Sequence, residues 1–160
     1  MTLHDYIDRL KGKTVAVVGI GVSNLPLIRL LAKSGVDVTA CDKNSAEELG
    51  AVYSELAAMG VKFRLGKHYI DSLDFDVVFR TPGLHPFKLK DAVRPDTVVT
   101  SEMEAFFDVC PCRVIAITGS DGKTTTSTLI ARLLAAEGYT VHLGGNIGKP
   151  LLRQGRRGGP

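Results

Sequence analysis

The sequence of 160 residues has no tryptophan, few other aromatic residues and no long apolar run. Its apolar stretches, such as 15–18 and 115–117, are far shorter than the about 20 residues that a membrane-spanning helix needs. It also lacks a basic segment followed by an apolar one at its start, so no secretion signal is expected. With 44% hydrophobic and 23% charged residues, the composition is not that of a disordered or collagen-like chain. We expect a cytoplasmic globular protein that does not insert into membranes.

Cysteine is also scarce, and the three cysteines do not form a known framework. Cys110 and Cys112 flank a proline, a spacing that is neither the C-x-x-C redox motif nor half of a zinc site. The four histidines show no metal-ligand spacing either. The cysteines are therefore expected to be free thiols in a reducing compartment.

A strong charge of either sign is absent as well. The formal net charge is +3, and Arg153, Arg156 and Arg157 all lie in the last eight residues. The rest of the chain holds 17 basic and 17 acidic residues, so it has no basic stripe of the kind that binds nucleic acid. We expect residues 153–160 to be a non-native or disordered tail.

What the sequence does contain is a regular alternation of apolar strands and amphipathic helices. This order predicts an α/β fold with a parallel sheet covered by helices on both faces, whose ligands bind at the carboxyl ends of the strands. Ser101 and Glu104 have the spacing of a capping box for the third predicted helix. The predicted strands are 14–18, 36–41, 61–65, 76–79, 98–100, 113–118 and 140–143, and the predicted helices are 25–33, 46–59, 101–109 and 123–137.

A first glycine-rich segment, GIGVSN at 19–24, directly follows the first predicted strand and opens a helix. It resembles the Rossmann phosphate loop, in which glycines permit a tight turn and the helix N-terminus offers free N–H groups to a diphosphate. The third glycine of G-x-G-x-x-G is replaced by Asn24. Asp42 ends the second strand, where an acid can accept hydrogen bonds from a ribose or a base. Taken alone, these features favour NAD binding.

A second glycine-rich segment, TGSDGKTTT at 118–126, lies between an apolar strand and a long helix. It ends as a P-loop does, with Gly122, Lys123 and Thr124, although Ile117 occupies the place of the first glycine in the longer pattern. In such loops the backbone N–H groups and the lysine hold phosphates, and the hydroxyl binds Mg²⁺. The segment therefore predicts phosphate binding.

Together with TPGL at 81–84, SEMEAFF at 101–107 and GGNIGKP at 144–150, these segments resemble the Mur ligase family, and within it the D-glutamate-adding enzymes of peptidoglycan synthesis. The resemblance covers about residues 13–152. It implies a Rossmann-like UDP-sugar-binding domain over 1–100, followed by the truncated start of a central P-loop ATP-binding α/β domain over 101–152. It also implies a monomeric complete enzyme in which ATP phosphorylates the carboxylate of UDP-N-acetylmuramoyl-L-alanine and the amine of D-glutamate attacks the acyl phosphate.

The resemblance also implies roles for individual residues, with ATP and Mg²⁺ as the cofactors. Lys123 and Thr124 would be catalytic, and Thr124 would be the Mg²⁺ ligand. The residues implied for the ATP phosphates are Gly119, Ser120, Asp121, Gly122, Lys123, Thr124 and Thr125, and those implied for the UDP-sugar are Gly21, Val22, Ser23, Asp42, Lys43, Thr81, Gly83 and Asn146.

Two departures from the family and two other readings complete the sequence-based picture. Lys43 stands where the family has a small hydroxyl residue, and Asp121 where asparagine is frequent. We expect the chain to be a ligase fragment that binds UDP-sugar but does not turn over alone. The alternatives are an NAD-binding Rossmann oxidoreductase or regulatory module, and a stand-alone P-loop kinase or scaffold.

Overall fold

The computed structural model describes residues 1–144 of the chain. The expectations for Asn146, for the rest of the third glycine-rich segment and for the tail at 153–160 lie outside these residues. Among the described residues, no helix has the length and apolar character needed to cross a membrane.

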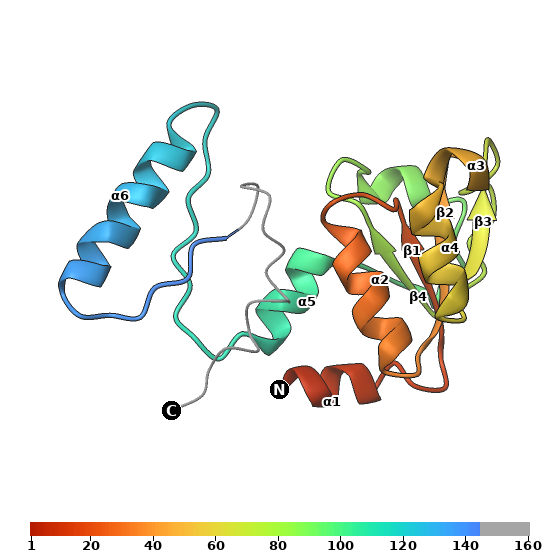
Figure 1. Cartoon of the computed structure of the whole chain (residues 1–160), viewed down its shortest axis with the longest axis horizontal. Helices are drawn as coiled ribbons and strands as arrows, with labels where there is room; N and C mark the ends of the chain where they lie inside the picture. Colours follow the sequence, from red (N-terminus) through yellow and green to blue (C-terminus); the bar gives the residue numbers. More distant parts are fainter. Residues whose placement is uncertain (145–160) are drawn as a thin grey trace.

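A parallel sheet of five strands forms the centre of the fold (Figure 1). The strands are β1 (Thr14–Val18), β2 (Asp37–Asp42), β3 (Lys62–Leu65), β4 (Val77–Arg80) and β5 (Val98–Ser101), in the order β3-β2-β1-β4-β5. Every pair of neighbours is parallel. The chain moves outward from β1 to β3 and then returns to place β4 on the other side of β1. The α/β prediction is confirmed, and the strand order reverses between β1 and β4.

The helices follow the predicted order with two exceptions. They are α1 (Leu3–Asp8), α2 (Asn24–Lys33), α3 (Ala46–Leu49), α4 (Ala51–Ala58), α5 (Glu102–Val109), α6 (Lys123–Ala136) and the short 3₁₀ helix η1 (Pro86–Leu89). Helix α1 was not predicted, although Thr2 and Asp5 close a capping box at its start. The single helix predicted at 46–59 is wrong, because Gly50, with φ +52° and ψ −120°, separates α3 from α4.

The core has two layers, and β1 contributes to both. Val15 and Val17 face a cluster that includes buried residues of α1, α2, α4 and α5, whereas Ala16 and Val18 face Leu73 on the other side. That second side is covered by the segments 66–76 and 84–93, which contain η1. The expectation of α-helices on both faces is therefore wrong for the described residues, because the connections before and after β4 contain no α-helix.

Residues 110–144 depart most from the predicted pattern. The strands predicted at 113–118 and 140–143 are absent from the described structure, because a strand needs a hydrogen-bonded neighbour and neither segment has one. Val114 and Ile115 are 48% and 58% exposed. Helix α6 forms as predicted but buries no residue, and Figure 1 shows it away from the sheet, on the far side of α5.

Candidate nucleotide site

The carboxyl ends of β1 and β4 lie side by side where the strand order reverses, with Val17 paired to Phe79. Ligands of parallel α/β sheets bind in the crevice at such a switch point. Two of the predicted segments follow these strands, residues 19–23 after β1 and residues 81–84 after β4. They are in contact, because a Cβ atom added to Gly19 would lie 3.2 Å from the Cβ of Thr81. Gly19 also has a φ of +92°, so glycine is required here on two grounds.

The glycine loop after β1 is held in place by hydrogen bonds to backbone carbonyl groups of β1 and β2. The N–H of Gly19 donates to the carbonyl of Cys41 at 2.7 Å, and the Asn24 amide donates to the carbonyl of Val18 at 2.9 Å. Asn24 is 1% exposed and stands where the usual motif has its third glycine. That glycine permits close packing of the helix on the strand, whereas the Asn24 side chain forms a buried hydrogen bond at this place. Burial also raises the pKa of the Cys41 thiol to about 11. The loop is thus fixed before any ligand arrives.

Asp42 lies at the end of β2, where its carboxylate accepts two backbone hydrogen bonds. Its Oδ2 accepts a hydrogen bond from the N–H of Ile20 at 2.6 Å, and its Oδ1 accepts one from the N–H of Asn44 at 2.9 Å. The residue is 8% exposed. Oδ2 therefore ties the glycine loop to the end of β2, and Oδ1 closes the local turn after that strand. The neighbouring Lys43 is exposed at the same end of β2.

The predicted ligand-binding residues of the two loops remain accessible above this support. Gly21, Val22 and Gly83 are exposed, and Val22 has 71% of its surface exposed. Ser23 and Thr81 are partly exposed. These residues therefore lie in the two loops that border the expected ligand crevice at the carboxyl ends of β1 and β4, and α2 begins directly after the first loop.

Arg80, the last residue of β4, was missed by the sequence reasoning. Its Nη2 donates to Oε1 of Glu104 at 3.0 Å, and its Nη1 donates to the carbonyl of Leu84 at 3.5 Å. Glu104 therefore does not complete the predicted capping box, and only its backbone N–H donates to the Ser101 hydroxyl, at 3.2 Å. The sequence signal that could have identified Arg80 is a basic residue directly before Thr-Pro-Gly, at the end of a predicted strand.

The second glycine-rich segment forms a loop before α6. Gly119 and Gly122 have φ values of +151° and +71°, which suit glycine. The Lys123 ammonium donates to the carbonyl of Ser120 at 2.8 Å and also to that of Gly119. Asp121, Thr124 and Thr125 are exposed. The loop contacts itself, and no described hydrogen bond or ion pair joins it to the crevice between β1 and β4.

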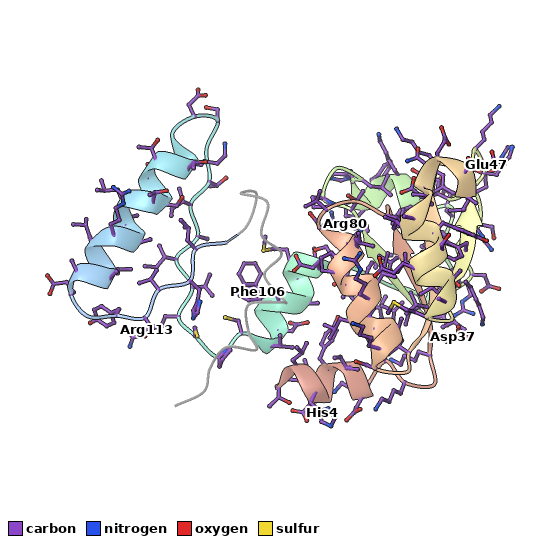
Figure 2. All side chains as sticks on the ribbon, in the orientation of Figure 1. His4, Asp37, Glu47, Arg80, Phe106 and Arg113 are labelled. Atoms are coloured by element: carbon purple, nitrogen blue, oxygen red, sulfur yellow. The ribbon has the colours of Figure 1, made fainter. Side chains whose placement is uncertain are left out.

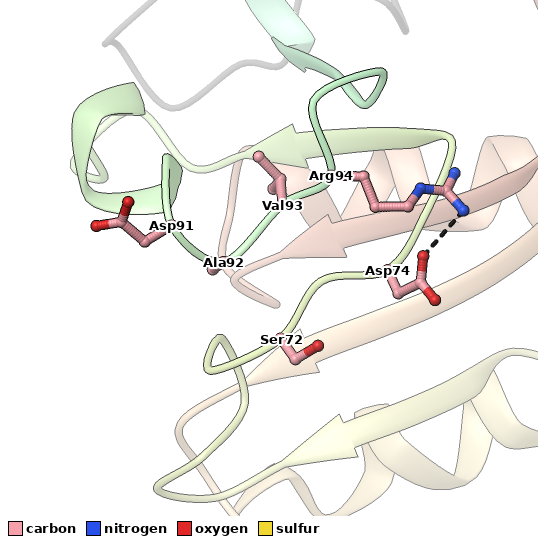
Figure 3. Close-up of a pocket in the computed structure, with 6 residues that line it drawn as sticks. All are labelled: Ser72, Asp74, Asp91, Ala92, Val93 and Arg94. Carbon is pink, nitrogen blue, oxygen red and sulfur yellow. Dashed lines mark ion pairs between the residues drawn. The ribbon is translucent and has the colours of Figure 1, made fainter.

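A separate pocket of about 320 Å³ lies near the amino ends of β4 and β5, away from the predicted site (Figure 3). Arg94 crosses it and pairs with Asp74 and Asp76, each at 2.9 Å, and with Asp96 at 3.3 Å. Hydrogen bonds from Thr14 and the Arg94 guanidinium lower the pKa of Asp76. Arg94 in this pocket already pairs with three carboxylates, so the pocket does not compete with the crevice as a nucleotide site.

The parallel sheet, with a glycine-rich loop at its switch point, defines a Rossmann-like nucleotide-binding fold. Among solved structures, SirC, a precorrin-2 dehydrogenase, is 17% identical with a TM-score of 0.45, covering 82% of this chain and 68% of that one. The A chain of dipicolinate synthase from Bacillus subtilis is also 17% identical, with a TM-score of 0.43, covering 79% of this chain and 47% of that one. No protein-family model matches the chain.

Curated relatives are much more similar, and three of them carry the name UDP-N-acetylmuramoylalanine–D-glutamate ligase. Those from Ruminiclostridium cellulolyticum, Clostridium novyi and Acetivibrio thermocellus are 52%, 50% and 48% identical, each over 94% of this chain. The chain therefore belongs to the Mur ligase family. It spans about a third of the length of these relatives, since 33% of each is covered.

Proposed function

We propose that this chain binds the UDP-sugar substrate of a D-glutamate-adding Mur ligase and holds the first part of the ATP site of that enzyme. The observation that carries the proposal is the glycine loop at the switch point, held by Asn24 and Asp42 of the chain itself. Such a loop binds with little loss of conformational entropy. The names of the relatives supply the ligand, UDP-N-acetylmuramoyl-L-alanine.

In this proposal the diphosphate lies on the backbone N–H groups of Gly21, Val22 and Ser23, at the N-terminus of α2. Thr81 and Gly83 close the uridine pocket from the β4 side. Asp42 acts on the ligand through the loop, because its Oδ2 holds the N–H of Ile20. Two further contacts are assigned to side chains on the basis of the family resemblance alone, those of Lys43 and Asn146.

The ATP phosphates are assigned to the loop of residues 119–125. Lys123 would leave the carbonyls of Gly119 and Ser120 and donate to the phosphates instead. The exposed Thr124 hydroxyl would hold Mg²⁺, which supplies charge neutralisation for phosphoryl transfer when it is bound. The exposed Asp121 adds a negative charge beside these phosphates, which opposes ATP binding.

The complete ligase would transfer the γ-phosphoryl group of ATP to the alanyl carboxylate of the UDP-sugar, with release of ADP. The amine of D-glutamate would then attack the acyl phosphate, which forms the amide and expels phosphate. We propose domains at 1–100 and 101–152, a cytoplasmic location and a monomeric complete enzyme that binds no nucleic acid. The chain as given would bind UDP-sugar without turnover, because it spans only a third of the relatives.

A thermal-shift assay of the 160-residue chain with UDP, NAD and ATP·Mg²⁺ tests the proposal. We expect UDP to raise the midpoint of unfolding of the sheet-containing part and NAD to leave it unchanged, because Thr81 and Gly83 are proposed to close a pocket for uridine. A shift with NAD and none with UDP would replace the ligase assignment of the crevice by the oxidoreductase alternative.

A further inference from the structure

We infer that Arg80 contacts the diphosphate of the nucleotide bound in the crevice between β1 and β4. The inference rests on the proposed UDP-sugar site and adds to it a ligand-binding side chain. It depends on the position of Arg80, on the charges of the surrounding loops and on the partner that holds the guanidinium.

Arg80 lies at the crevice through the backbone itself. It follows Phe79, which pairs with Val17 of β1, and it precedes Thr81, which touches Gly19 of the glycine loop. Its side chain is only 16% exposed, and Figure 2 shows it at the side of the sheet that faces α5. The guanidinium is therefore held between the loop after β4 and helix α5, through Leu84 and Glu104, instead of extending into solvent.

The two loops provide hydrogen-bond donors but no charge. Residues 19–23 and 81–84 contain no lysine, arginine, aspartate or glutamate. Asp42 is turned toward the N–H groups of Ile20 and Asn44. A diphosphate carries at least two negative charges, and a partly buried arginine is suited to it because its planar fork can donate two parallel hydrogen bonds. Arg80 supplies the missing positive charge at the β4 side of the crevice.

The guanidinium has donors left for a ligand. It has five N–H groups, and its described contacts use one for Glu104 and one for the carbonyl of Leu84. The contact with Glu104 uses a single nitrogen at 3.0 Å, and the Glu104 side chain is 51% exposed. Glu104 thus orients Arg80, but its carboxylate also offsets part of the charge that a diphosphate would use.

Substitution of Arg80 and substitution of Glu104 should therefore have opposite effects on the affinity for UDP. Arg80→Gln removes the charge and should weaken UDP binding by about tenfold, the loss typical of one charge-assisted hydrogen bond. Glu104→Gln removes the competing carboxylate and should strengthen UDP binding, by about threefold at a partly exposed site. A purely structural ion pair would give the same direction for both, because either change breaks the same contact.

The experiment is a titration of the 160-residue chain with UDP and with uridine, which lacks phosphates, followed by ligand-observed NMR. For Arg80→Gln we expect weaker UDP binding with unchanged uridine binding, a smaller dependence of UDP affinity on salt, and partial recovery in Arg80→Lys. Arg29→Gln is the matched control, because it breaks the Arg29–Glu55 ion pair between α2 and α4, outside the crevice, and should leave UDP binding unchanged.

Four results would overturn the inference, and they differ from one another. Equal losses for UDP and uridine in Arg80→Gln would mean that the residue only supports the loop. Unchanged UDP binding in Arg80→Gln, or weaker binding in Glu104→Gln, would remove the charge argument. Failure of the unmodified chain to bind either ligand would reject the nucleotide site itself, and the role of Arg80 with it.

Discussion

Asp42→Asn tests whether Asp42 supports the glycine loop or contacts the ligand. The two carboxylate oxygens accept from the N–H groups of Ile20 and Asn44 at 2.6 and 2.9 Å. An asparagine side chain keeps one acceptor oxygen, but its NH₂ group must face the other backbone N–H. One backbone donor beside an 8% exposed side chain therefore loses its acceptor.

The expected cost is about 2 kcal/mol, since hydrogen bonds to charged groups contribute about 1.5–3 kcal/mol each. For a unit of roughly 100 residues this corresponds to a fall of about 8 °C or more in the midpoint of thermal unfolding. Circular dichroism during heating would measure it. Asp37→Asn is the matched control, because Asp37 pairs with Lys62 at 2.8 Å with its side chain 47% exposed. That exposed pair should contribute less than about 1 kcal/mol.

Equal shifts for the two variants would refute the supporting role. A second readout separates support from contact. If Asp42 bound the ligand through a free oxygen, Asp42→Asn would weaken UDP binding while leaving the unfolding midpoint within a degree or two of the unmodified chain. We expect Asp42→Asn to lower the unfolding midpoint of the chain without added UDP. A loss of UDP affinity should accompany this loss of stability.

Three further predictions concern other parts of the chain. Lys123→Ala in the complete ligase should abolish formation of the acyl phosphate, measured by trapping with hydroxylamine, and should leave UDP binding intact; loss of UDP affinity would contradict the proposed division of the two sites. Because burial raises the pKa of the Cys41 thiol to about 11, a thiol reagent at pH 8 should modify the other two cysteines of the native chain and reach the third only after denaturation; three rapidly reacting thiols would refute this. Hydrogen bonds from Thr14 and the guanidinium of Arg94 lower the pKa of Asp76 below 3.8, so its contribution to stability is present above that pH and is lost as the pH falls below it. Asp76→Asn should therefore lower the unfolding midpoint at pH 7 and reduce the further fall between pH 5 and pH 2, and an unchanged pH profile would contradict the assignment.

The strands of the sheet were predictable because each is an apolar run that ends in a glycine or a polar residue. The strand predicted at 14–18 is reproduced without change as β1, since Val15 to Val18 are buried on both faces of the sheet. The same rule failed at 113–118, where an equally apolar run has no neighbouring strand in the described structure. Pattern identifies a segment that is able to pair, but pairing depends on the rest of the sheet.

The site was predictable only in part, for a related reason. Motif spacing placed the glycine loop and residues 81–84 at strand ends, and the strand order then made them neighbours. The same spacing predicts Asp42 as a ligand-binding acid, and this stays a prediction. Sequence alone did not indicate that its carboxylate accepts from the N–H groups of Ile20 and Asn44. Arg80 was missed because its orientation depends on Glu104, a residue 24 positions away on helix α5.

The two glycine-rich loops of the chain differ in what holds them. The loop at 19–23 is attached to the sheet through Asn24 and Asp42, both at least nine-tenths buried, so its N–H groups are positioned before a ligand binds. The loop at 119–125 is closed by its own Lys123, and it precedes a helix that buries no residue. A 14-residue helix is marginally stable without tertiary packing, so the second loop has little support from the described residues. ATP would have to displace the Lys123 ammonium and order the loop at the same time. Nucleotide binding at the sheet edge therefore requires less reorganisation, and we expect UDP to bind this chain more tightly than ATP.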